Sequence, residues 1–127
     1  MLSGMAPRRV LLIDDEDDIR EIAQLSLEMV AHWDVVTASS GAEGLLRAAE
    51  AQPDAILLDV MMPDLDGVAT LGRLQADPAT SHIPVIFLTA KVQAAELSEL
   101  GAVSVIPKPF DPMRLSSQVA SSLGWTD

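Results

Sequence analysis

Residues 55–59 read AILLD, a run of four apolar residues that ends in a carboxylate. Apolar residues at every position, rather than at every second one, are typical of a parallel strand with helices on both of its faces. A lone carboxylate at the end of such a strand would be costly to bury without a partner. The stretch therefore predicts a buried parallel strand whose last residue, Asp59, belongs to a polar site.

Three more apolar runs end in the same way. The polar residues that follow them are Asp14 and Asp15 after VLLI (10–13), Thr89 after VIFL (85–88), and Lys108 after VSVIP (103–107). The carboxyl ends of parallel strands lie along one edge of a sheet, where open α/β proteins bind their ligands. We therefore expect these side chains to converge with Asp59 on one site.

Strand-like and helix-like patterns alternate along the chain. The predicted strands are 8–13, 33–37, 55–58, 83–88 and 103–106, the last ending before Pro107. Helical patterns follow the strands, beginning after Asp17 or Asp18, after Ser40, after Gly67, near Glu96 and after Pro112. The expected inner face of the first helix is Ile19, Ile22, Ala23, Ser26 and Val30. This order predicts an α/β fold in one domain over residues 5–124, with a doubly wound, five-stranded parallel sheet and helices on both faces.

The composition argues against several classes of protein. The chain has 127 residues and a net charge of −11, from 19 acidic and 8 basic residues. Such a chain repels phosphate backbones, so we expect no direct nucleic-acid binding. Cysteine is absent, and no apolar run approaches the ~20 residues of a membrane span. The first residues lack the apolar core of a signal peptide, so we expect a cytoplasmic protein with no membrane contact.

The three carboxylates predict a metal site. Taken alone, Asp14 and Asp15 could be acids that cap a helix. A third carboxylate, Asp59, would be repelled by them unless a cation lay between them. Oxygen ligands without His or Cys suit Mg²⁺, or Mn²⁺, better than zinc.

Lys108 and Thr89 extend the prediction to phosphoryl transfer. Each has a simpler explanation, since Lys108 could only balance the acids and Thr89 could only end a strand. Together with a metal, however, they supply the positive charge and the hydroxyl donor that a transferring phosphoryl group requires. A carboxylate can then act as the nucleophile and form an acyl phosphate.

Four motifs in this order resemble the receiver domain of bacterial two-component response regulators, in the CheY-like superfamily with its flavodoxin-like (βα)5 fold. They are LLIDDE, LLDVMMPDLDG, FLTAK and PKPF, and the resemblance covers residues 8–123. It implies that Asp59 accepts phosphate from a sensor histidine kinase or a histidine phosphotransfer protein. The domain would then be a signalling phosphoacceptor that slowly loses its phosphate, rather than an enzyme.

The resemblance also assigns roles around Asp59. It implies that Asp15, Asp59 and the backbone carbonyl of Met61 bind Mg²⁺ directly, and that Asp14 holds the ion through water. Lys108 would contact the phosphoryl oxygens, and Thr89 would move toward them.

Further implications concern the signal. The Lys108–Pro109 peptide is expected to be cis. Receivers usually carry Tyr or Phe three residues before the lysine, as a switch coupled to the threonine, and this chain has Val105. Signalling through the usual aromatic switch is therefore not expected. Met61 and Lys91 are either shields that prolong the phosphoryl lifetime or ordinary loop side chains.

The partners and two rival functions stay open at this point. The resemblance places the signalling surface, and any dimer contact, on the fourth helix, fifth strand and fifth helix, roughly residues 91–123. The downstream partner, or output domain, is not identified by the sequence. One rival is a metal-dependent aspartyl phosphatase or phosphotransferase, which would typically carry an acid where Met61 stands. The other is a receiver-like module that binds partners without accepting phosphate.

Overall fold

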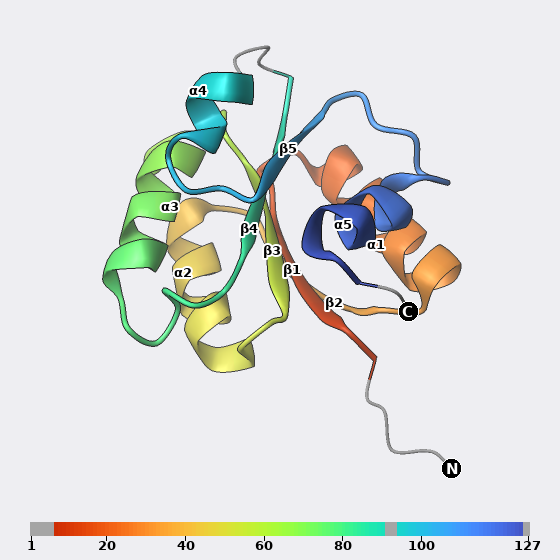
Figure 1. Ribbon diagram of the computed structural model, residues 1–127, viewed down its shortest axis with the longest axis horizontal. Coiled ribbons are helices and arrows are strands. Elements are labelled where there is room, and N and C mark those ends of the chain that lie inside the picture. The colour runs from red at the N-terminus through yellow and green to blue at the C-terminus, as the bar shows by residue number, and fades with distance from the viewer. Residues whose placement is uncertain (1–6, 91–93, 126–127) are drawn as a thin grey trace.

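Strands and helices alternate through the computed structural model, which describes residues 7–90 and 94–125 (Figure 1). The strands are β1 (Arg9–Ile13), β2 (Asp34–Ala38), β3 (Ala55–Asp59), β4 (Val85–Thr89) and β5 (Ser104–Pro107). The helices are α1 (Asp17–Ala31), α2 (Gly41–Ala51), α3 (Gly67–Ala76), α4 (Ala94–Ser98) and α5 (Leu115–Leu123). The predicted domain start at residue 5, and Lys91, lie outside the described residues.

The strands form one parallel sheet in the order β2-β1-β3-β4-β5. Helices α1 and α5 cover one face, and α2, α3 and α4 cover the other (Figure 1). The predicted doubly wound α/β fold is therefore confirmed. Because the strand order places β1 and β3 side by side at the centre, Asp14 and Asp59 come to neighbouring positions at the carboxyl edge.

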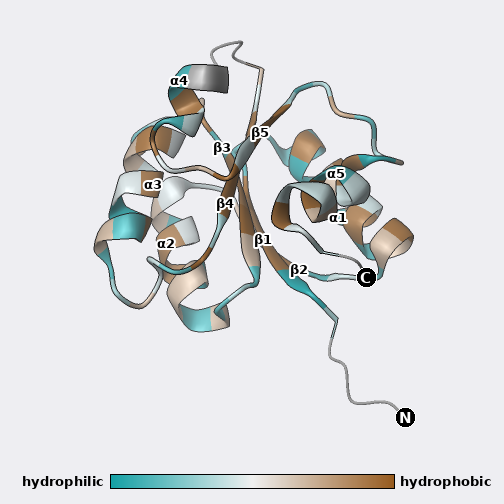
Figure 2. Ribbon diagram, in the orientation of Figure 1, coloured by the Kyte–Doolittle hydropathy of each residue, from teal (hydrophilic) through white to brown (hydrophobic). Residues whose placement is uncertain are grey.

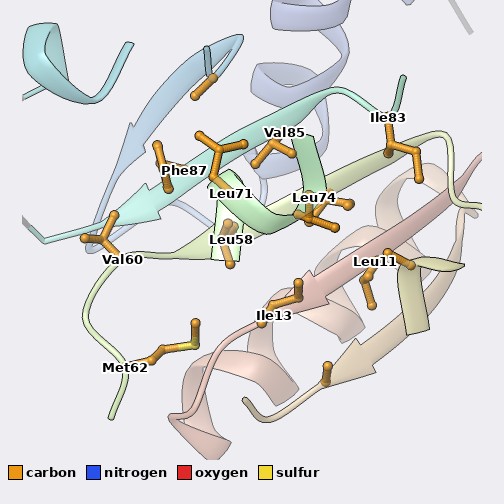
Figure 3. Packing of buried hydrophobic residues seen from close by; sticks show 14 of the residues in the cluster. Leu11, Ile13, Leu58, Val60, Met62, Leu71, Leu74, Ile83, Val85 and Phe87 are labelled. Carbon is orange, nitrogen blue, oxygen red and sulfur yellow. The ribbon is translucent and has the colours of Figure 1, made fainter. Parts of the chain in front are cut away.

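The central strands are buried on both faces, and each face has its own core. Leu11 and Ile13 of β1 point to the side of α2, α3 and α4, where Leu71 and Leu74 of α3 meet them (Figure 3). The alternate residues of β1 point to the side of α1 and α5. Figure 2 shows the result, with brown apolar strands in the middle and teal positions on the outer helix surfaces. The continuous apolar pattern of the strands arises from this double cover.

Helix α1 differs from its prediction in two ways. Its N-cap is Glu16 rather than Asp17 or Asp18, and its buried residues are Ala23, Ser26 and Leu27. Two residues of the expected inner face, Ile22 and Val30, are exposed. The buried stripe is narrow because small residues let the helix approach the chain before α5, where the Ser26 hydroxyl donates to the Pro112 carbonyl oxygen.

Strand β5 runs one residue further than predicted, through Pro107. The Val103 amide donates to the Val85 carbonyl oxygen at 2.8 Å. Every second residue of a parallel strand donates to the same neighbouring strand, so residue 107 would be expected to donate to β4 as well. Proline has no N–H, and the Lys108 amide donates to the Thr89 carbonyl oxygen instead, at 2.9 Å. The strand therefore includes the proline, and the bond from the next residue holds the backbone of Lys108 against the end of β4.

Within the described ranges, 7–90 and 94–125, the structure has no helix with the length and apolar character needed to cross a membrane.

Candidate functional site

The carboxyl edge of the sheet gathers the predicted acids into one cluster. Asp59 ends β3, while Asp14 and Asp15 follow β1. One carboxylate oxygen from each of the three lies within 4.8 Å of the others. Asp14 and Asp59 are buried, which a pair of lone carboxylates would not tolerate without compensating charge.

Lys108 supplies that compensating charge. Its ammonium nitrogen lies 2.8 Å from Asp14 Oδ2, 3.2 Å from Glu16 Oε1 and 3.4 Å from Asp59 Oδ1. Only 9% of its side chain is exposed. The Lys108–Pro109 peptide is cis. One cation thus contacts three carboxylates, and the link to Glu16 is one that the sequence reasoning missed.

The turn after β1 is fixed by several hydrogen bonds around Asp14. The Asp14 amide donates to the Ala38 carbonyl oxygen at 3.1 Å, and Asp14 Oδ1 accepts from the Glu16 amide at 2.9 Å. Arg20 donates to the Asp14 carbonyl oxygen at 2.8 Å and to Asp17 at 2.6 Å. Arg20 was also missed, although an isolated basic residue just after five consecutive acids was a signal that could have pointed to it.

Burial and charge perturb the two central groups. Burial raises the pKa of Asp59 from 3.8 to about 6, and the neighbouring Asp14 carboxylate adds to the rise. Lys108 and the Met61 backbone amide oppose the rise without cancelling it. Burial works to lower the pKa of Lys108, but the hydrogen bond and charge of Asp14, with Asp59 and Glu16, raise it above its ordinary value. The site therefore keeps its cation charged while it makes the Asp59 carboxylate costly to ionise.

Two oxygens in the cluster have no hydrogen-bond partner although both are shielded from solvent. They are Asp15 Oδ1 and Asp59 Oδ2. Buried carboxylate oxygens are normally hydrogen-bonded or bound to a cation. An oxygen-only set of this kind fits a hard divalent cation such as Mg²⁺. The residues present therefore fit the metal that the sequence predicted.

The loop after β3 depends on a close backbone approach at Gly67. A Cβ at this position would overlap with the Asp59 carbonyl oxygen and lie 2.7 Å from Val60 Cα. The Gly67 amide donates to the Val60 carbonyl oxygen at 2.9 Å, and Asp66 caps α3 by accepting from the Ala69 amide. The loop thereby turns back against Asp59 and leaves the side chain of Met61 mostly exposed.

Thr89 and Val105 lie on neighbouring strands. Thr89 ends β4 and is fully buried, one residue past Leu88, which pairs with Asp59. Val105 pairs with Phe87 and packs, half-buried, against the core under α2, α3 and α4. The structure thus brings Thr89 to the same edge as Asp59 and Lys108, while Val105 serves as a core residue.

Comparison with known proteins identifies the family. A family model described as the response regulator receiver domain matches residues 10–120. The chain belongs to the response regulator receiver domain family. The predicted receiver resemblance and its place in two-component signalling are therefore confirmed.

Receiver-containing relatives and receiver structures agree with this assignment. The DNA-binding dual master transcriptional regulator RpaA of Synechocystis is 38% identical over 94% of this chain and 50% of that protein. The response regulator PleD of Caulobacter vibrioides is 40% identical over 89% of this chain and 25% of that protein. The chemotaxis protein CheY4 of Vibrio cholerae superposes with a TM-score of 0.84 at 29% identity, covering 92% of this chain and 99% of that one.

A putative response regulator from Chloroflexus aurantiacus superposes equally well. Its TM-score is 0.84 at 33% identity, with 94% of this chain and 99% of that chain covered. This receiver domain spans about half the length of several curated relatives that it matches. What those longer proteins do as a whole is therefore not carried over to this chain.

Proposed function

We propose that Asp59 is the phosphoacceptor of this receiver domain. The observation that carries the proposal is the environment of the two Asp59 carboxylate oxygens. One oxygen contacts Lys108 at 3.4 Å, and the other is shielded from solvent without a hydrogen-bond partner. Burial raises the pKa of Asp59 to about 6, still low enough for the ionised, nucleophilic form to prevail at neutral pH.

The transfer itself needs only positioning and neutralisation of charge. A carboxylate oxygen of Asp59 attacks the phosphorus of a phosphohistidine, an O–P bond forms, and the N–P bond breaks. The bonding electrons go to the imidazole nitrogen, which takes up a proton. In the second half of the cycle, water attacks the phosphorus, the O–P bond to Asp59 breaks, and inorganic phosphate leaves the regenerated carboxylate.

The acidic cluster would hold the metal that this chemistry uses. We assign Asp15, Asp59 and the Met61 backbone carbonyl as direct ligands, with Asp14 acting through water. Bound Mg²⁺, or Mn²⁺, supplies positive charge next to the acceptor carboxylate and the phosphoryl oxygens. Lys108 would supply a second positive charge, with its ammonium nitrogen 3.4 Å from Asp59 Oδ1, and Thr89 would offer a hydroxyl to the phosphoryl group.

A histidine kinase or histidine phosphotransfer protein is the proposed phosphoryl donor. The face of α1 next to the site would fit a donor that presents a helix. An open groove of about 420 Å³ lies between α1 and the chain before α5. Its apolar lining includes Ile22, Leu25 and Met29, all exposed, and Met113. Helix α1 begins shortly after the turn that carries Asp14, and Pro112 and Met113 of the segment that follows Lys108 complete the lining.

Two observations separate this function from its rivals. Met61 stands where an aspartyl phosphatase would typically carry its second acid, and its exposed side chain has no proton to give. Asp59 and Lys108 are intact and in contact, which a module that only binds partners would not need. The cytoplasmic location and a dimer through α4, β5 and α5 stay predictions.

Labelling from a small phosphodonor tests the function. With acetyl phosphate and Mg²⁺, we expect stable labelling by one phosphoryl group per chain and no turnover of p-nitrophenyl phosphate. Continuous turnover would favour the phosphatase, and the absence of any label would favour the binding module. Leu25→Glu should slow transfer from a phosphorylated histidine donor without slowing labelling by acetyl phosphate.

A further inference from the structure

Glu16 does not use its side chain as an N-cap residue normally does. It precedes the first residue of α1 with extended backbone, yet it makes no side-chain hydrogen bond to the helix. Ser, Thr, Asp and Asn are preferred at this position because their side chains accept from the first helical amides. Glu16 instead extends across the site, and its Oε1 lies 3.2 Å from Lys108 Nζ. The N-terminus of α1 therefore lacks a side-chain cap, and the Glu16 side chain instead contacts a residue far away in sequence.

This contact is one of two hydrogen bonds that Lys108 donates, the other being to Asp14. An ammonium group has three N–H donors and no acceptor. The three carboxylates of Asp14, Glu16 and Asp59 surround it at 2.8, 3.2 and 3.4 Å. A phosphoryl group formed on Asp59, as proposed above, brings new oxygens to Lys108, and these compete with the contacts to Asp14 and Glu16.

Burial decides which contact breaks at the lowest cost. Asp14 is fully buried, and both of its carboxylate oxygens are engaged, one by Lys108 and one by the Glu16 amide. Separating Lys108 from Asp14 would leave a buried charge unpaired. The side chain of Glu16 is 60% exposed, so water replaces its partner at little cost.

We propose that Glu16 is a positioning residue that holds Lys108 in the unphosphorylated domain and gives it up to the phosphoryl group. This inference rests on the proposed function of Asp59. The Glu16–Lys108 ion pair then competes with the phosphoryl oxygens for one N–H donor. It biases the domain toward its unphosphorylated state by an amount that an exposed ion pair can supply, about two- to five-fold in an equilibrium constant.

Three variants separate this role from simple repulsion of anions. Glu16→Gln keeps the length of the side chain and removes its charge. Glu16→Asp keeps the charge, shortens the reach to Lys108, and places a preferred N-cap residue at the helix end, so it should fold at least as well. Asp18→Asn is the matched control, because it removes one exposed charge from the same first turn of α1.

The affinity for beryllofluoride, a phosphoryl analogue, is measured by calorimetry in Mg²⁺. We expect Glu16→Gln and Glu16→Asp to bind it about two- to five-fold more tightly than wild type, with Asp18→Asn unchanged. In the absence of beryllofluoride, the ¹⁵N signal of the Lys108 ammonium should move in both Glu16 variants and not in the control.

Two outcomes overturn the inference. One is that Glu16→Asp behaves as wild type while Glu16→Gln and Asp18→Asn gain equally, since this pattern indicates repulsion by charge alone. The other is a Lys108 ammonium signal that both Glu16 substitutions leave in place. Failure of wild type and all variants to bind beryllofluoride would instead refute the proposed function and the release step, while the ammonium signal still tests the resting contact.

Discussion

Replacing the proposed acceptor by its uncharged isostere, Asp59→Asn, should stabilise the metal-free domain. The Asp59 carboxyl is 3% exposed, and its pKa rises from 3.8 to about 6 because of burial and the Asp14 carboxylate. At about 1.4 kcal/mol per pKa unit, this rise costs the ionised native state up to about 3 kcal/mol. Asparagine keeps the shape of the side chain and removes that cost.

The pH dependence of stability shows in which direction the ionisation of Asp59 acts on the native state. Well below pH 3.8 both folded and unfolded states bind the proton, so the carboxyl costs nothing. As pH rises, the unfolded chain releases its proton near 3.8, whereas the native state keeps its proton until about 6. Wild-type stability from this group is therefore lost as pH rises from about 3.8 to about 6, and the advantage of Asp59→Asn should be full at pH 8 and about a third of that at pH 4.5.

Urea and thermal unfolding in EDTA measure this difference. At pH 8 we expect a gain of up to about 3 kcal/mol, or roughly 10 °C in midpoint for a domain of this size. Glu50→Gln, which removes an exposed charge from α2, is the control and should change little. A gain that is equal at pH 8 and pH 4.5, or a loss of stability at pH 8, would refute the electrostatic reasoning.

Three other changes test the cation site, the loop and the lysine. Millimolar Mg²⁺ should raise the thermal midpoint of wild type and not that of Asp15→Ala. At ten times its Kd, the ion should add about 1.4 kcal/mol to the free energy of unfolding. An unchanged wild-type midpoint would count against a cation site. Gly67→Ala should cost about 1–3 kcal/mol in urea unfolding because its Cβ meets the Asp59 carbonyl oxygen. Gly72→Ala, with open space around its Cβ, should instead gain about 0.5–1 kcal/mol, and equal effects of the two would contradict the loop geometry. Lys108→Met leaves buried Asp14 without its cation and should lower the free energy of unfolding by about 3 kcal/mol. A variant as stable as wild type would contradict this expectation.

The sheet was predictable because burial on both faces leaves a direct mark on the sequence. AILLD and the runs before Asp14 and Thr89 are apolar at consecutive positions, as strands covered by helices on both sides must be. Polar residues at their ends then indicated which edge carries the site. The parallel topology converts these separate sequence positions into neighbours, so the cluster of Asp14, Asp15 and Asp59 followed from the pattern alone.

The contacts that fix the site were less predictable, because they depend on where long side chains reach. Local preferences favoured Asp17 or Asp18 as the N-cap of α1, but the contact of Glu16 with Lys108 depends on two long side chains that meet at the carboxyl edge, from the turn after β1 and the end of β5. Arg20 could have been paired with any of the acids before it, and only the turn geometry directs it to the Asp14 carbonyl.

The end of α5 shows the same dependence on tertiary structure. Trp125 packs edge-on against Trp33 with ring centroids 5.3 Å apart, and the Arg8 guanidinium lies 4.3 Å from the centre of its ring. These residues come from the two ends of the domain and from the position just before β2. No local pattern relates them, so this contact between the end of α5 and the sheet could not be predicted from the sequence.

The most direct test of the account is the position of the phosphoryl group after labelling. Wild type and Asp59→Asn are incubated with acetyl phosphate and Mg²⁺, treated with borohydride to convert any acyl phosphate to homoserine, and mapped by peptide mass spectrometry. We predict homoserine at position 59 in wild type and at no carboxylate in Asp59→Asn. Label at Asp14 or Asp15 in wild type, or labelling of Asp59→Asn at the wild-type level, would contradict the assignment of Asp59 as the acceptor.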